Sequence, residues 1–226
     1  MSDVNAGELK TDRVSLRRRP DRGHYDHASV AAVLDQTFLC HIGFDVEGQP
    51  FVIPTSFGRK DKTVYVHGSS ASRMLRHVAK GFPICLTVTI LDGLVLARSA
   101  FNHSMNYRSA VILGTARLVE GEEKYRALEI MADHMLPGRW DETRLPNETE
   151  MVATSVLALD IAEASVKIRK GPPLDDDEDL AHPCWAGIVP VNSYVHAPIA
   201  DPRSPKPVEP PSYLKNIRGL PMTETK

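Results

Sequence analysis

The sequence predicts a mainly β protein with flanking helices, built as an antiparallel barrel or sandwich. At least four apolar runs rich in β-branched and aromatic residues precede any long helical pattern. Polar segments suited to turns separate these runs. Strands and helices do not alternate, and no G-x-G-x-x-G motif is present, which argues against a doubly wound nucleotide-binding fold.

The N-terminal part contains one helix and the first strand. Residues 1–16 are polar, and we expect a disordered tail there. Four arginines follow between Arg17 and Asp26, together with Pro20 and Gly23, and the pattern of residues 27–35 indicates a helix. The run FLCHIGFD over 38–45 indicates the strand that follows it.

A hairpin and a short helix form the centre of the chain. Residues 51–57 and 63–68 are rich in β-branched and aromatic residues, which indicates two strands. The polar segment GRKDK between them supplies the turn. Met74, Leu75 and Val78 then recur at helical spacing, with Ser70 or Ser72 before them as a cap. We expect a short helix directly after the hairpin.

The second half returns to strands. Runs over 86–101 and 107–120 predict two strands, and residues 120–136 predict a helix that Pro137 and Gly138 end. Residues 152–161 and 165–171 are strand material, and the acidic segment 172–179 is typical of a solvated loop. Seven prolines after residue 197 exclude a regular sheet. We divide the chain into a tail (1–16), one domain (17–196) and a proline-rich arm or tail (197–226).

Composition favours a compact, cytoplasmic protein with reduced cysteines. The 226 residues are 42% hydrophobic and 25% charged, with a formal net charge of −2, so nucleic acid is not an expected partner. The three cysteines are widely spaced and lack a Cys-x-x-Cys pair, which favours reduced thiols over disulfides or zinc. The polar N-terminus and the lack of a long apolar run predict neither secretion nor a membrane span.

An anion site is predicted where the hairpin meets the short helix. The hydroxyls of Ser69, Ser70 and Ser72 and the guanidinium of Arg73 converge there with backbone N–H groups of the helix start. A phosphate group suits such donors. The alternative is that the serines only cap the helix and that Arg73 is solvated.

The order of these parts resembles the FMN-binding split β-barrel family of pyridoxamine 5′-phosphate oxidase, and more closely its Nim-type subgroup of flavin-nucleotide-binding proteins. The resemblance covers roughly residues 16–191. It rests on the strand at 52–57, the Ser72-Arg73 pair, the Arg108-Ser109 strand that ends in Gly114-x-Ala116, and the late Trp185-x-Gly187.

The resemblance implies an FMN cofactor in a homodimer, with the flavin at the interface. It places the strand along the flavin ring, the Ser-Arg pair on the cofactor phosphate and the indole beside the flavin. The residues it assigns to the cofactor are Val52, Ile53, Thr55, Ser56, His67, Gly68, Ser69, Ser72, Arg73, Arg108, Ser109 and Trp185.

Two departures from the family pattern affect the expected activity. A lysine of the first flavin strand is replaced here by Thr55 or a neighbour, and Ile188 to Val191 stand where the oxidase has Arg-Leu-His-Asp-Arg. The residues that bind the substrate phosphate in the oxidase are therefore missing from this sequence. We expect a flavoprotein oxidoreductase that reduces another small molecule with electrons from a reduced nicotinamide. The alternative is a non-catalytic carrier or sensor, holding flavin, haem or a deazaflavin.

Two histidines are candidates for catalysis. His67 matches a histidine near the flavin in Nim-type proteins, and His103 lies in a polar cluster between strands that either protonates substrate or is a plain loop. His24, His27 and His41 fall on separate elements without ligand spacing, so no metal site is predicted. The arginines at 17, 18, 19 and 22 either reach an anion or form a solvated basic turn.

Overall fold

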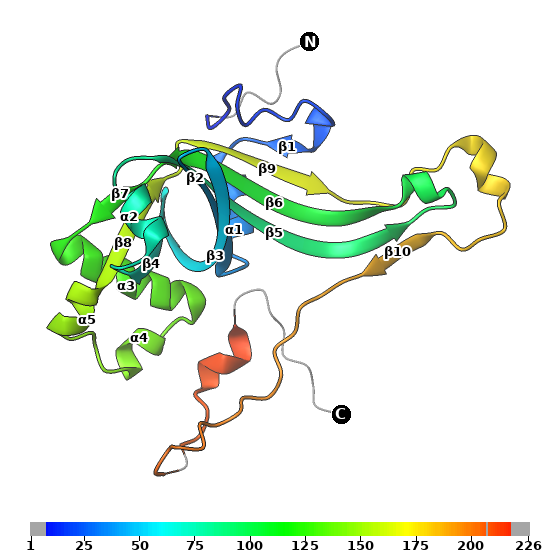
Figure 1. Ribbon diagram of the computed structural model, residues 1–226. Coiled ribbons are helices and arrows are strands. Elements are labelled where there is room, and N and C mark those ends of the chain that lie inside the picture. The colour runs from blue at the N-terminus through cyan, green and yellow to red at the C-terminus, as the bar shows by residue number, and fades with distance from the viewer. Residues whose placement is uncertain (1–7, 207, 218–226) are drawn as a thin grey trace.

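The computed structural model describes residues 8–206 and 208–217. One ten-stranded antiparallel sheet dominates this part of the chain, in the order β1-β9-β6-β5-β2-β3-β4-β8-β7, with β10 paired to β5 (Figure 1). β1 and β7 end the path and do not pair with each other, so the curved sheet stays open. The expected mainly β fold with flanking helices is confirmed.

The elements have the following bounds. The strands are β1 Gly23–His24, β2 Leu39–Val46, β3 Gln49–Lys60, β4 Thr63–Ser69, β5 Pro83–Leu96, β6 Ser104–Thr115, β7 Arg117–Val119, β8 Thr154–Asp160, β9 Glu163–Arg169 and β10 Gly187–Pro190. The α-helices are α1 His27–Leu34, α2 Arg73–Val78, α3 Gly121–Met135, α4 Arg139–Glu142 and α5 Glu148–Ala153, and 3-10 turns lie at Pro20–Arg22, Ala100–Asn102, Asp177–Ala181 and Ser212–Asn216.

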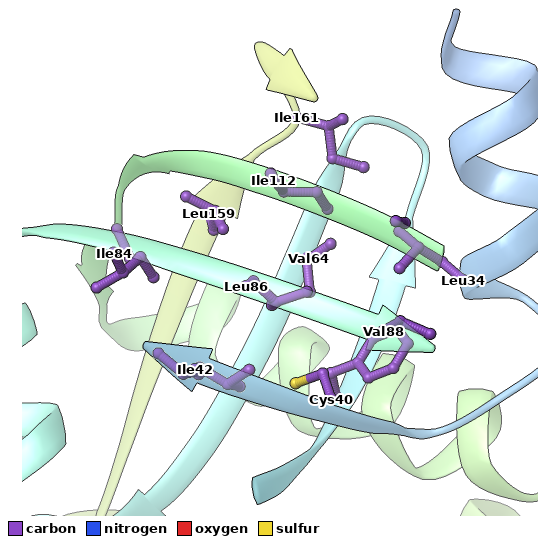
Figure 2. Close-up of a cluster of buried hydrophobic side chains, with 14 of the residues drawn as sticks. Leu34, Cys40, Ile42, Val64, Ile84, Leu86, Val88, Ile112, Leu159 and Ile161 are labelled. Atoms are coloured by element: carbon purple, nitrogen blue, oxygen red, sulfur yellow. The ribbon is translucent and has the colours of Figure 1, made fainter. Parts of the chain in front are cut away.

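The main core fills the inside of the curved sheet. Cys40 and Ile42 from β2 meet Leu86 from β5 and Ile112 from β6, because alternate residues of a strand point to the same face (Figure 2). α1 closes one side with Leu34, which is fully buried. Each such aliphatic side chain contributes roughly 1.5–3 kcal/mol by leaving water.

A second, smaller core lies under α3. Ala127 and Met131 of this helix pack on Tyr65, Val156 and Ala158 of the neighbouring strands. The helix therefore covers the face of β3, β4 and β8 that turns away from the main core. This helix frames the candidate site.

Two predicted strands are interrupted. The strand expected over 107–120 breaks at the buried Ala116, because β6 pairs with β5 and β9 whereas β7 crosses to β8. The strand expected from residue 152 begins at Thr154, because Asn147 and Glu150 form a capping box that starts α5.

Residues 8–16 are not the disordered tail that their polarity predicts. Leu9 is 2% exposed and joins the main core. Its N–H donates to the carbonyl of Tyr25 (3.0 Å), and its own carbonyl accepts from Ala164 (3.2 Å). Two buried apolar side chains, Leu9 and Val14, therefore fix this segment. The remainder of the expected tail, residues 1–7, lies outside the described residues.

The proline-rich segment is extended in its described part. It returns to the body at Tyr213, whose hydroxyl donates to Glu142 on α4 (2.5 Å) and accepts from Arg139 (3.3 Å). Residues 207 and 218–226 of the expected arm lie outside the described residues.

β5, β6 and β10 form an arm that extends away from α2 and α3 (Figure 1). β10 approaches β5 closely at Gly93, where an added Cβ would lie 3.0 Å from the carbonyl oxygen of Val189. Among the described residues, no helix combines the length and apolarity that crossing a membrane requires.

Candidate functional site

A cavity of about 350 Å³ lies between the sheet and the helices α3, α4 and α5. Ser56 of β3 and His67 of β4 form its floor, since the pairing of Phe57 with Val66 places them side by side. Its walls are mostly apolar. They comprise Leu128, Met131, Ala132, Met135, Trp140, Pro146, Glu150, Met151 and Thr154.

The imidazole of His67 is the main chemical group of this cavity. His67 is an exposed residue, yet the protein atoms that surround part of its ring lower the pKa of His67 below its ordinary value of 6.5. The neutral ring therefore predominates at pH 7, and a neutral imidazole presents one nitrogen lone pair to a proton or a metal. None of the described residues forms a hydrogen bond to this ring.

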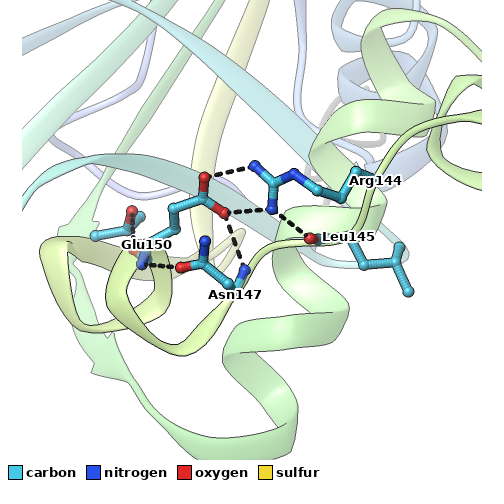
Figure 3. Close-up of polar contacts among 5 residues, drawn as sticks. Arg144, Leu145, Asn147 and Glu150 are labelled. Atoms are coloured by element: carbon cyan, nitrogen blue, oxygen red, sulfur yellow. Dashed lines mark hydrogen bonds and ion pairs between the residues drawn. The ribbon is translucent and has the colours of Figure 1, made fainter.

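A polar cluster at α5 forms one rim of the cavity (Figure 3). The carboxylate of Glu150 accepts two hydrogen bonds from Arg144, at 2.6 and 3.0 Å, and one from the backbone N–H of Asn147 at 2.9 Å. Hydrogen bonds from Arg144 and then from Asn147 lower the pKa of Glu150 to about 2. Arg144 thus neutralises the negative charge of Glu150 at the rim, and the interior of the cavity stays apolar.

The predicted phosphate residues follow His67 at the C-terminal end of β4, where the chain enters α2. Ser72 caps α2 by accepting from the N–H of Leu75, and this 3.4 Å contact is long. Arg73 is exposed, with its guanidinium 4.2 Å from the ring centroid of Phe51 on β3. It forms no ion pair with any described residue. Because α2 has only six residues, the anion would be held by this charge and the serine hydroxyls.

The other predicted residues of β3 and β4 lie on either side of this strand pair. Val52 is 66% exposed, whereas Ile53 packs against the main core. Thr55 pairs in register with Cys40. Gly68 permits close packing of α2, since a Cβ there would lie 3.0 Å from a methyl group of Leu75. Nine of the twelve predicted cofactor residues therefore lie within the segment 52–73.

Arg108 and Ser109 lie on β6, outside this segment, and as neighbours in a strand they point to opposite faces of the sheet. The guanidinium of Arg108 binds the carboxylate of Asp92 (2.6 Å) and also donates to the side chain of Gln36. Ser109 lies on β6 between Thr89 of β5 and Lys167 of β9. The charge of Arg108 is therefore compensated within one chain.

Trp185 and His103 lie at the arm, because Trp185 precedes β10, which pairs with β5, and His103 precedes β6. Trp185 is 65% exposed and its ring lies over Gly187, where a Cβ would be 2.9 Å away. His103 accepts a hydrogen bond at Nδ1 from the N–H of Ala97 (3.0 Å). Within one chain these two residues do not reach the cavity of His67, and their predicted roles stay predictions.

The sequence alone did not reveal the walls of the cavity. The spacing of Met131 and Met135 indicates only the apolar face of a helix, and a tryptophan such as Trp140 is by default a core or interface anchor. No local motif connects residues 56, 67 and 128–154, because only the pairing of β4 with β8 places α3 and α5 beside β4. No group of three or more metal-binding side chains occurs among the described residues.

Comparison with known proteins places the chain in a family. The sequence model of pyridoxamine 5′-phosphate oxidase matches residues 26–168. The flavocytochrome Anf3 from Azotobacter vinelandii is 44% identical, with a TM-score of 0.87, covering 92% of this chain and 97% of that one. The FAD and haem binding protein from Mycobacterium smegmatis is 34% identical, with a TM-score of 0.83, covering 88% and 98%. No curated protein matched the sequence.

A more distant structure shares the fold. A protein from Bacteroides thetaiotaomicron assigned to 5-nitroimidazole antibiotic resistance is 24% identical, with a TM-score of 0.53, covering 65% of this chain and 86% of that one. The matched profile, the open curved sheet and these relatives confirm the resemblance that the sequence suggested. The chain belongs to the pyridoxamine 5′-phosphate oxidase family and has its split-barrel fold.

Proposed function

We propose that the protein binds a flavin nucleotide together with haem and works as an oxidoreductase. The observation that carries the proposal is the identity of 44% to a flavocytochrome over nearly the full length of both chains. The 34% identical relative, described as binding FAD and haem, supports the same pair of cofactors. We retain a flavin nucleotide as the expected cofactor, and the description of the 34% identical relative favours FAD over the FMN that the sequence suggested.

Arg73 fits the phosphate of such a flavin. Its charge has no carboxylate partner among the described residues, and the hydroxyls of Ser69, Ser70 and Ser72 precede it in the chain. Charge-assisted hydrogen bonds from a guanidinium to phosphate are strong. Phe51 holds the guanidinium in place from one side.

His67 is the residue that would hold a haem iron. Its neutral imidazole is the donor type that haem iron takes, and three methionines and Trp140 give its cavity the apolar walls that a porphyrin face requires. Flavin and haem supply two-electron and one-electron redox chemistry, while the protein binds them and excludes water.

A homodimer would complete the site. The arm exposes apolar side chains from three strands, among them Leu94, Met105 and Val189, and the exposed Trp185 lies beside them. Such a surface is typical of an interface. A partner's arm would bring Trp185 and His103 towards the cavity of the first chain. Sedimentation analysis should give the mass of a dimer, and a monomer would refute this part of the proposal.

The first experiment is an absorption spectrum of the purified protein, with the flavin released and identified as FAD or FMN. We expect flavin and haem bands, bleaching of the flavin by a reduced nicotinamide, and reoxidation by a small-molecule acceptor. A colourless protein that cannot be reconstituted with flavin or haem would refute the proposal. Bound cofactors without turnover would refute the oxidoreductase and leave a carrier or sensor.

Arg73→Ala tests the phosphate contact. Loss of a charged hydrogen bond of about 1.5–3 kcal/mol should weaken flavin binding roughly 10- to 100-fold. Arg126→Ala is the matched control, because it removes an arginine that pairs with Glu129 on the outer surface of α3. Equal flavin affinity in the two variants would remove Arg73 from the site.

A further inference from the structure

A second cavity, of about 890 Å³, lies where the N-terminal segment meets β9 and the tip of the arm. Gly23 of β1 pairs with Lys167, which places the preceding Arg22 beside the end of β9. Arg18, Arg19, Arg22, Lys167 and Arg169 line the cavity, as does His103. No aspartate or glutamate is among its described lining residues.

Arg169 is a buried charge in this cavity without an acidic partner. It is 4% exposed, and its guanidinium donates to the Asn106 side chain and to the carbonyls of Gly171 (3.1 Å) and Pro172 (3.4 Å), all of which are neutral. Its Nε is buried and has no hydrogen-bond partner among the described residues. Burial and the nearby charge of Arg22 lower the pKa of Arg169. An unpaired buried charge is costly, and an anion in the cavity would offset that cost.

The other basic residues are also uncompensated. Arg18, Arg19 and Arg22 form no ion pair with a described residue, and Lys167 lies 5.9 Å from the ring centroid of Tyr107. Elsewhere in the fold arginines do find carboxylates, as Arg98 does with Asp175. The positive charges of the basic segment therefore gather at this cavity, and no described carboxylate pairs with them there.

The remaining walls indicate the kind of anion. Tyr107 and Phe101 supply aromatic rings, and Leu94, Met105 and Leu174 supply apolar surface. Aromatic rings stack on planar bases and arginines bind phosphate oxygens in pairs. Five cationic side chains exceed what a single phosphate needs.

We infer that this cavity binds the diphosphate of a dinucleotide. The inference rests on the proposed redox function, because that function takes electrons from a reduced nicotinamide dinucleotide, whose diphosphate is separate from the flavin phosphate assigned to Arg73. The site shares no residue with the one at Arg73, since Arg73 begins α2, which packs on β2, β4 and β8.

The test compares an Arg18→Ala, Arg22→Ala double variant with an Arg126→Ala, Arg203→Ala control. Both remove two exposed or half-exposed arginines, and the control residues lie outside the cavity. Binding of ADP and of adenosine to the purified holoprotein is measured by calorimetry, and released FAD and FMN are quantified. Circular dichroism checks that both variants are folded.

If a separate nucleotide occupies the cavity, ADP binds the wild type and the control, adenosine binds far more weakly, and the double variant binds ADP about tenfold or more weakly. If the wild type does not bind ADP and the double variant retains less FAD than the control, the cavity belongs to the flavin and the inference is overturned. Equal ADP affinity and equal FAD content in the two variants would overturn the inference. Selective loss of haem from the double variant would also overturn it, by assigning the cavity to propionates. A protein without flavin or haem would refute the proposed function, whereas ADP binding that depends on Arg22 would still establish the cavity.

Discussion

Gly58 lies where β3 passes closest to α3, the helix that covers the cavity of His67. A Cβ added at Gly58 would lie 2.6 Å from the Cα of Met131 and 2.9 Å from its backbone nitrogen. These are backbone atoms of a helix, so the clash cannot be relieved by rotating a side chain. Gly58→Ala must push α3 away from the sheet.

The cost follows from this geometry. Overpacking a well-filled interior by one methyl group typically costs about 1–3 kcal/mol. In a domain of this size that lowers the melting temperature by roughly 2–12 °C. Because Met131 lines the cavity of His67, the displaced helix should also weaken retention of a haem there.

Gly43→Ala is the matched control. This glycine also lies inside a strand, but a Cβ there meets its neighbours at ordinary distances of 3.6–4.0 Å. The substitution should be neutral or should stabilise the fold by up to about 1 kcal/mol through the unfolded state. Both variants are compared by urea unfolding and by haem-to-protein ratio. A Gly58→Ala protein as stable as Gly43→Ala would refute the packing argument.

Two further predictions concern titratable groups. Glu150 has a pKa of about 2 against an ordinary 4.5, so its contribution to α5 is complete above pH 4.5 and is lost as the pH falls through about 2. NMR titration of its carboxyl should show this low midpoint, and a midpoint near 4.5 would contradict the cluster with Arg144. Burial raises the pKa of Cys40 to about 12 and also raises that of Cys85, whereas Cys184 is exposed. Mass spectrometry of alkylated native protein should find Cys184 modified first, and rapid labelling of Cys40 would contradict its burial.

Several elements could be predicted because their signals are local. The hairpin over 51–68 and the helix at α3 follow from alternation and helical spacing within single windows. The phosphate residues Ser72 and Arg73 lie together in sequence, so their proximity required no knowledge of the fold. The order of these parts was enough to suggest the family.

Other elements depend on contacts between distant segments. The break at Ala116 arises because β7 pairs with β8, some forty residues later, and no property of residues 107–120 signals that partner. Leu9 and Val14 stand in a polar segment, and only their burial under the sheet orders it. Local patterns cannot report such long-range packing.

The sequence by itself predicted a mainly β fold, a candidate anion site at the end of β4 and the loss of the family's substrate-phosphate motif, since the signals for these lie in the residue types of short stretches. The tertiary structure alone decided which helices enclose His67, that Trp185 lies on a distant arm, and that Arg22 meets Lys167 and Arg169. The physical reason is that strand pairing and helix packing join segments up to about 150 residues apart, and the free energy of those contacts resides in neither segment alone.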